Sequence, residues 1–190
     1  SKETLKKRVD ETLAEINSKM SNWYDQSEIS SVNSNTSGEP IDLSHELFDV
    51  INIAKDINIK SNGAFDVTSA PLINLWGFGP KKTKKKIPTE VEVNKALKLV
   101  GQVQLLELIP GLNQLKKATP KVSINLSALA KGYGIDMVAS TLEEQKIRNF
   151  LVEIGGDLIT SGTNKDGKAW TIGIEAPKVE EQIVQSVIKI

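Results

Sequence analysis

Ser123-Ile-Asn-Leu-Ser-Ala-Leu-Ala-Lys-Gly-Tyr-Gly134 is the stretch of sequence that decides the fold. The residue order predicts a strand over residues 122–126 that turns directly into a helix over about 128–145. Asn125 and Ser127 stand at the junction, where backbone N–H groups of a helix are unpaired and its dipole favours anions. Lys131, one turn into the helix, adds a positive charge suited to a phosphate. Gly132 and Gly134 leave room for a ligand or another backbone to approach.

Two interpretations of this stretch stay open. One is an anion site at the start of the helix. The other is a capped helix with a surface lysine and small residues packed against a sheet. The Gly-x-x-x-x-Gly-Lys spacing of a P-loop is missing, so that phosphate-binding motif is excluded.

The rest of the sequence predicts a mixture of helices and strands. Apolar residues at helical spacing over 5–20 indicate a first helix, and polar residues 25–40 indicate a loop. A second helix is predicted to start near Ser44 and to stop at Asn62-Gly63, and a capping box opens a third at Thr89. Strands are predicted over residues 103–109, 115–118 and 150–154, and a hairpin joins 158–162 to 170–175 around Asp166-Gly167.

Composition excludes several classes of chemistry. The 24 basic residues balance 24 acidic ones, which argues against a large electrostatic surface for nucleic acid or anionic membrane. There is no cysteine, so disulfides, thiolate metal sites and a cysteine nucleophile are excluded. Because His45 is the single histidine, a histidine metal cluster or a Ser-His-Asp triad is disfavoured.

Four further segments carry two interpretations each. Asp66, in an apolar neighbourhood, is either a turn carboxylate bonded to nearby N–H groups or an acceptor for a ligand. Trp23 and Tyr24 either seal a helix end or stack on a flat heterocycle, whereas Trp76 and Phe78 are predicted to be core. The glycines of Val152-Glu-Ile-Gly-Gly-Asp157 either form a tight connection or admit a ligand, and lysine-rich residues 81–86 are either a solvated loop or a phosphate patch.

Taken together and in this order, these segments resemble the FAD:protein FMN transferase family, the ApbE-like flavin transferases. The similarity extends over nearly the whole chain. The matching segments are Met20-Ser-Asn-Trp23 with Ser27-Glu-Ile-Ser30, Gly63-Ala-Phe-Asp66 leading to Leu75-Trp-Gly-Phe-Gly-Pro80, Asn125-Leu-Ser-Ala-Leu-Ala-Lys-Gly-Tyr133, Leu151-Val-Glu-Ile-Gly-Gly-Asp157 and Trp170-Thr-Ile-Gly-Ile-Glu-Ala-Pro177.

The resemblance implies an α+β fold of the T-fold-like kind, with a mixed or antiparallel sheet and packed helices. It implies Mg²⁺-dependent transfer of FMN from FAD to a Thr or Ser hydroxyl of a target protein, with release of AMP. Acceptors of the family include subunits of Na⁺-translocating NADH:quinone oxidoreductase. Its members are typically bacterial lipoproteins of the periplasm, so the full-length form is expected to be anchored to the inner membrane through lipid alone.

The same resemblance assigns roles to individual residues. Ala128 matches a residue whose backbone carbonyl binds Mg²⁺, an ion that accepts carbonyl and pyrophosphate oxygens and needs no Cys or His. The implied FAD contacts are Trp23, Ala64, Phe65, Asp66, Asn125 and Lys131.

The chain departs from the family pattern in two respects. Asn125 stands where the family usually has Asp, which lowers the local negative charge. The family's N-terminal strand and C-terminal section are missing from these 190 residues. That section supplies an FAD contact, a Mg²⁺-binding Asp and Thr, and the residues around a functional His, so the catalytic residues are expected there. We therefore expect residues 1–190 to be a single, truncated flavin transferase domain with an incomplete site.

Three other functions remain open at this point. The protein is alternatively a non-catalytic FAD-binding protein, which Asn125 keeps in view, or a pyrophosphatase that splits FAD into FMN and AMP. The last alternative is a structural or interaction domain with no ligand. Incubation with FAD, Mg²⁺ and a Thr-containing acceptor distinguishes these functions by their products.

Overall fold

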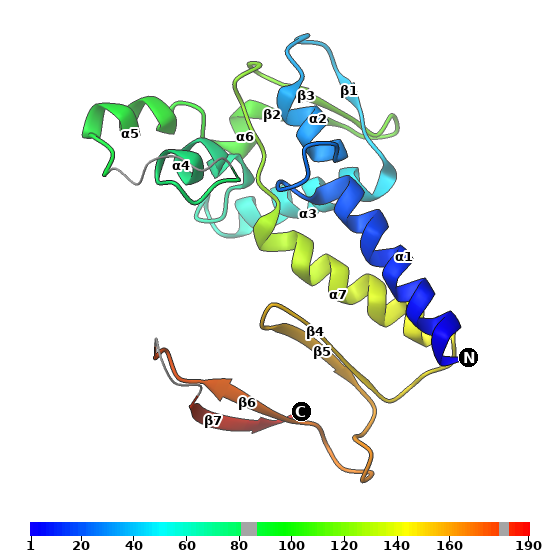
Figure 1. The fold of residues 1–190 in the computed structure, drawn as a ribbon. Coiled ribbons are helices and arrows are strands. Elements are labelled where there is room, and N and C mark those ends of the chain that lie inside the picture. The colour runs from blue at the N-terminus through cyan, green and yellow to red at the C-terminus, as the bar shows by residue number, and fades with distance from the viewer. Residues whose placement is uncertain (81–86, 179–182) are drawn as a thin grey trace. The chain divides into compact units, whose positions relative to one another are not determined.

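A computed structural model describes residues 1–80, 87–178 and 183–190 (Figure 1). The chain divides into two compact units: Leu13–Ala130, and Ser1–Thr12 together with Lys131–Ile190. The helices α1 (Lys2–Met20) and α7 (Ser127–Glu144) each contribute residues to both units. One domain over residues 1–190 stays a prediction, and the lysine-rich run 81–86 lies outside the described residues.

The unit Leu13–Ala130 packs helices with one small antiparallel sheet. The sheet has the order β1-β3-β2, formed by β1 (Ile41–Asp42), β2 (Leu106–Ile109) and β3 (Gln114–Lys117). Its helices, besides the shared α1 and α7, are α2 (Glu28–Ser34), α3 (His45–Lys60), the 3₁₀ turn η1 (Val67–Ser69), α4 (Ala70–Leu75), α5 (Glu90–Leu97) and α6 (Gln102–Leu105).

The central helix α3 follows directly from its sequence. The Ser44 side chain caps it by accepting from the N–H of Leu47 at 3.3 Å. Beyond its end, Asn62 and Gly63 take positive φ angles of 53° and 81°, which breaks the helix as predicted. The core stripe Leu47, Val50, Ile51 and Ala54 is buried on one face. Burying these side chains is the main contribution of α3 to stability.

Two elements of this unit differ from the prediction. The predicted loop 25–40 contains α2, because Ser27 caps a helix there and Ile29 and Val32, three positions apart, are buried. The predicted strand 103–109 is helical in its first residues, and only β2 is extended. The N–H of Gln102 donates to the Asp66 carboxylate at 2.8 Å, so a residue distant in sequence caps α6. A capping partner 36 positions away leaves no local signal.

The second unit contains two separate antiparallel hairpins. The strand β4 (Phe150–Ile154) pairs with β5 (Asp157–Ser161), and β6 (Thr171–Glu175) pairs with β7 (Val184–Lys189). The predicted pairing of residues 158–162 with 170–175 is therefore wrong. Gly155 and Gly156 take φ angles of 59° and 93°, which permits a two-residue turn that pairs β5 with β4.

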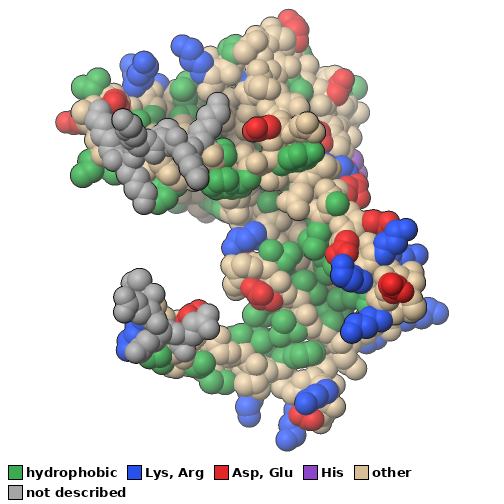
Figure 2. Space-filling view, viewed as in Figure 1, with side chains coloured by type: hydrophobic (Ala, Val, Ile, Leu, Met, Phe, Trp, Pro, Cys, Tyr) green, Lys and Arg blue, Asp and Glu red, His purple; other side chains and the backbone are tan. Residues whose placement is uncertain are grey.

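The hairpins leave many apolar side chains at the surface of this unit. Figure 2 shows hydrophobic side chains over its strands. In β7, Val184 and Val187 are each 60% exposed. In the described residues the α+β prediction, with antiparallel sheets and packed helices, is confirmed. No helix among these residues has both the length and the hydrophobicity of a membrane span.

Candidate functional site

The segment 122–126 alternates between the core and a cavity. Val122, Ile124 and Leu126 are fully buried, while Ser123 and Asn125 line a cavity of about 370 Å³. Although this alternation is that of a strand, the predicted strand is wrong, because the segment belongs to none of the described sheets. The helix that follows, α7, begins at Ser127 as the sequence indicates.

Side-chain amides take the place of a neighbouring strand along this segment. Asn33 accepts from the N–H of Ile124 at 2.7 Å and donates to its carbonyl at 2.9 Å. Asn22 donates to the same carbonyl at 2.8 Å and accepts from the N–H of Leu126 at 2.8 Å. The buried N–H and C=O groups of Ile124 and the N–H of Leu126 are thereby hydrogen-bonded without a neighbouring strand, and leaving them unpaired would be costly.

The cavity is polar on several sides. All its lining residues come from the unit Leu13–Ala130, and the polar ones include Asn22, Asp25, Ser30, Asn33, Ser123 and Asn125. A volume of 370 Å³ falls at the small end of the roughly 300–1,000 Å³ range of ligand pockets. The cavity therefore suits one part of a dinucleotide better than a whole one.

Asn125 caps the junction and faces this cavity. Its side-chain oxygen accepts from the N–H of Ser127 at 2.9 Å, and its own N–H donates to the Val67 carbonyl at 2.7 Å. Among the described residues, the Nδ2 group of Asn125 has no hydrogen-bond acceptor. The bond to Ser127 agrees with a capped helix start, and the Asn125 side chain still presents a donor to a ligand.

The Asp66 carboxylate is engaged within the protein. Its Oδ1 accepts from the N–H of Thr68 at 2.7 Å and from the Thr68 hydroxyl, and its Oδ2 accepts from the N–H of Gln102 at 2.8 Å and from Asn58 Nδ2 at 3.3 Å. The interpretation of Asp66 as a turn carboxylate is confirmed. A role in binding FAD stays a prediction.

Asp66 and Asn125 line different cavities. Asp66 borders one of about 440 Å³, together with Gly63 and Gly101. The two motifs are joined by a backbone hydrogen bond from Asn125 to Val67, the residue after Asp66. Ala64 is exposed and Phe65 is half-buried in the turn before Asp66.

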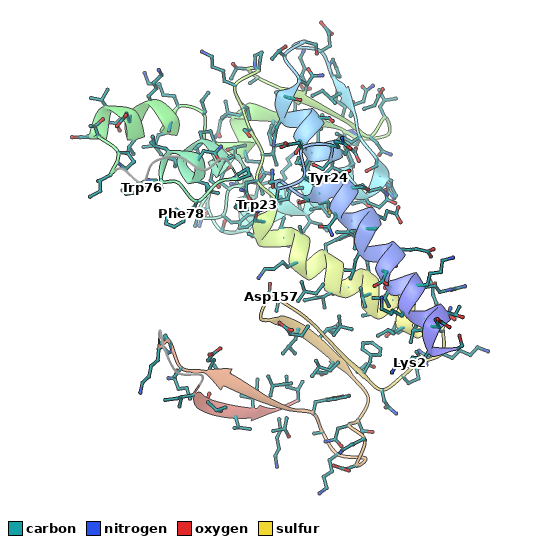
Figure 3. The ribbon with its side chains drawn as sticks, in the orientation of Figure 1. Lys2, Trp23, Tyr24, Trp76, Phe78 and Asp157 are labelled. Atoms are coloured by element: carbon teal, nitrogen blue, oxygen red, sulfur yellow. The ribbon has the colours of Figure 1, made fainter. Side chains whose placement is uncertain are left out.

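Four aromatic side chains of this unit lie at its surface: Trp23, Tyr24, Trp76 and Phe78 (Figure 3). Trp23 is 66% exposed beside Asn22, so its side chain is available to stack on a ligand. The prediction that Trp76 and Phe78 are core is wrong, because they are 47% and 76% exposed. Both follow α4 in a short segment that turns at Gly77 (φ 77°), so they do not share the buried face of a continuous element.

In the second unit, Lys131 is bonded to the turn between β4 and β5. Its ammonium donates to the Gly155 carbonyl at 3.1 Å and pairs with Asp157 at 3.0 Å. Figure 3 places Asp157 at the turn end of the hairpin. Because the Lys131 and Asp157 side chains are 45% and 55% exposed, the ion pair is weak and open to exchange with another anion.

Sequence reasoning missed Lys117, a buried cation. It is 7% exposed, and its ammonium donates to the carbonyls of Val32 at 2.9 Å, Asn33 at 3.2 Å and Pro120 at 3.4 Å. Burial lowers the pKa of Lys117. The C-terminal carbonyls of α2 are thus held by a positive charge, which a helix dipole favours. Lysines in strands are usually solvated, so nothing in the sequence around Lys117 marks it.

The donors for a metal ion are few. Ala128, whose carbonyl was predicted to bind Mg²⁺, lies in the first turn of α7. In the ranges 1–80, 87–178 and 183–190 there is no group of three or more His, Cys, Asp or Glu residues that could hold a metal.

Comparison with known proteins gives a consistent answer. The FAD:protein FMN transferase of Vibrio cholerae serotype O1 is 41% identical over 186 residues, which cover 98% of this chain and 55% of that protein. The FAD:protein FMN transferase of Haemophilus influenzae is 39% identical over 189 residues, with the same coverage of 98% and 55%. The chain therefore spans about half the length of these relatives.

Solved structures agree in fold. The flavin transferase ApbE from Vibrio cholerae superimposes with a TM-score of 0.91 at 41% identity, over 100% of this chain and 60% of that one. The apo flavinyl transferase ApbE of Pseudomonas stutzeri gives 0.87 at 29% identity, over 100% and 59%. Residues 1–190 match the ApbE family throughout. With the α+β architecture and the motif-bearing segments described above, this match shows that the chain belongs to the ApbE family.

Proposed function

We propose that the protein carrying this chain transfers FMN from FAD to a Thr or Ser hydroxyl of an acceptor protein. The observation that carries the proposal is the similarity of 98% of the chain to relatives named FAD:protein FMN transferase. Since the chain spans 55% of those relatives, the activity is proposed for the whole protein.

The start of α7 is the proposed phosphate-binding element. A helix of 18 residues carries a partial positive charge at its first turn, which suits a pyrophosphate. The donor of Asn125 beside the 370 Å³ cavity and the exposed ring of Trp23 support binding of a nucleotide there. Ala64, Phe65 and Asp66 remain proposed contacts, as does Lys131, whose exposed ion pair with Asp157 leaves its charge available to a phosphate.

The proposed transfer exchanges one phosphorus–oxygen bond for another. The acceptor hydroxyl oxygen bonds to the phosphorus of the FMN half, and the bond from that phosphorus to the bridging oxygen breaks. AMP leaves with the bridging oxygen, and the hydroxyl loses its proton. Positive charge near the pyrophosphate favours this exchange, because it neutralises charge that develops on the leaving group.

Magnesium dependence is part of the proposal. Mg²⁺ binds carbonyl and phosphate oxygens, so the Ala128 carbonyl and the pyrophosphate are suitable ligands. An acceptor such as a subunit of Na⁺-translocating NADH:quinone oxidoreductase and a periplasmic location stay predictions from the family resemblance.

The decisive experiment separates transfer from its alternatives. The protein is incubated with FAD, Mg²⁺ and a Thr-containing acceptor, and the products are resolved by mass spectrometry and chromatography. Transfer gives flavinylated acceptor and AMP in equal amounts. Free FMN with AMP indicates a pyrophosphatase instead, and unchanged FAD that is nevertheless bound indicates a non-catalytic binding protein.

A further inference from the structure

Asn22 and Asn33 stand between the core and the candidate nucleotide cavity. Both line the 370 Å³ cavity, and both hydrogen-bond to the backbone of residues 122–126 rather than to other side chains of the cavity. Asn22 lies two residues after the end of α1, and Asn33 lies in α2. Two elements from the start of the unit thus hold the segment that leads into α7.

The four hydrogen bonds fix which side of the segment faces the cavity. Rotating or shifting the segment by one residue would bury Ser123 and Asn125 and expose the fully buried Ile124. In a sheet, neighbouring strands prevent such a shift, but this segment belongs to none of the described sheets. The amides of Asn22 and Asn33 provide the constraint instead.

The backbone of Asn33 is itself held by the buried side chain of Lys117. The buried ammonium of Lys117 donates to the Asn33 carbonyl at 3.2 Å and to the neighbouring Val32 carbonyl at 2.9 Å. A continuous set of hydrogen bonds therefore runs from β3 through the end of α2 to Ile124, the residue before Asn125.

We propose that Asn22 and Asn33 are positioning residues for nucleotide binding, acting through Ile124 to hold Asn125 and the first turn of α7 toward the FAD pyrophosphate. This inference rests on the proposed function. In this role the two side chains need not contact the ligand themselves. Their amides hold the backbone of residues 122–126, and that backbone positions the groups that contact the ligand.

The shared acceptor gives the proposal a quantitative signature. The Ile124 carbonyl accepts a hydrogen bond from each asparagine. Substituting one asparagine leaves this carbonyl with the other as its donor, and substituting both removes the two donors. Each neutral hydrogen bond lost corresponds to roughly a twofold to tenfold change in an equilibrium constant, and each alanine variant loses two of the four bonds. We expect Asn22→Ala and Asn33→Ala each to raise the Kd for FAD roughly fourfold or more. The double variant is expected to raise it by more than the product of the two.

The test is an FAD titration of the protein that carries this chain, followed by flavin fluorescence. Each variant is titrated well below its unfolding midpoint, because a loss of stability alone does not change the Kd of folded protein. Asn35→Ala is the matched control. Asn35 lies at the end of the same helix, and its side-chain oxygen accepts from the N–H of Ser37 at 2.9 Å and from the Ser37 hydroxyl at 2.8 Å. A Kd for the double variant within twofold of the control overturns the proposal.

Two additions keep the test decisive. If an alanine variant does not fold, Asn33→Asp replaces it, since a carboxylate still accepts from the N–H of Ile124 but no longer donates to its carbonyl. Hydrogen exchange of the Ile124 and Leu126 amides is measured without FAD, and faster exchange in the variants is expected. If the wild type binds no FAD, the proposed function fails. Exchange at wild-type rates in the variants contradicts the positioning role by itself.

Discussion

Asp66→Asn tests whether this carboxylate holds the turn before α4 and the start of α6. The substitution preserves size but turns one acceptor oxygen into a donor NH₂ group. If the new group replaces Oδ2, it faces the N–H of Gln102 and the amide of Asn58, which both donate in the wild type. If it replaces Oδ1, it faces the N–H of Thr68. In either orientation, the hydrogen bonds that the replaced oxygen accepted are lost.

The expected magnitude follows from the number of bonds lost. A hydrogen bond to a charged group contributes about 1.5–3 kcal/mol, and one or two are lost. Asp66 is only half-buried, so water replaces part of the interaction. We therefore expect Asp66→Asn to lower the free energy of unfolding by about 2–4 kcal/mol. That is a large share of the roughly 5–15 kcal/mol typical of a folded protein.

The assay is urea unfolding without FAD, followed by circular dichroism. Asp42→Asn is the control, since the exposed Asp42 accepts from Gln114 Nε2 at 2.7 Å and the change is expected to cost under about 0.5 kcal/mol. Equal stability of the two variants would refute the structural role of Asp66. A higher Kd for FAD in Asp66→Asn, measured under conditions where the variant is folded, would support an additional role of Asp66 in binding.

Three further predictions test other parts of the structure. Lys131→Met is expected to weaken FAD binding roughly tenfold or more. The loss of its exposed ion pair with Asp157 is expected to cost under about 1 kcal/mol of stability. An unchanged Kd for FAD in a titration would contradict the role of Lys131 in binding. Burial lowers the pKa of Lys117 below its ordinary 10.5, so the unfolded chain binds more protons between the two values. The wild-type free energy of unfolding, relative to Lys117→Met, should therefore rise as pH rises toward 10.5, and a constant difference in urea unfolding across that window contradicts the burial argument. Gly156→Ala is expected to cost about 1–2 kcal/mol in thermal unfolding, because φ is 93° although a Cβ there meets no atom within 4 Å; no loss would show that the turn relaxes.

Local signals in the sequence predicted much of the fold. The helix after Ser44 and the capping box at Thr89 are visible because their caps lie within three residues of the helix start. The hidden features depend on partners far apart in sequence. Asp66 caps α6 from 36 positions away, and Asn22 and Asn33 hold residues 122–126 from about 100 and 90 positions away, as the bonds to Ile124 show.

The candidate site was predictable to a similar extent. The junction at Asn125 and the start of α7 lie where the residue pattern placed them, beside a cavity. The hydrogen bond from the Lys131 ammonium to the Gly155 carbonyl, at 3.1 Å, was not predictable, because neither segment carries a local sequence signal for it. The surface positions of Trp76 and Phe78 were mispredicted, since apolar character alone does not decide burial.

Titration of FAD with the purified protein, followed by flavin fluorescence, tests the central claim most directly. We predict a saturable change that is weakened in Asn125→Ala, since the Asn125 side chain both caps α7 and faces the cavity. No change in flavin fluorescence or absorbance at any protein concentration would contradict the assignment of a flavin nucleotide site to this chain.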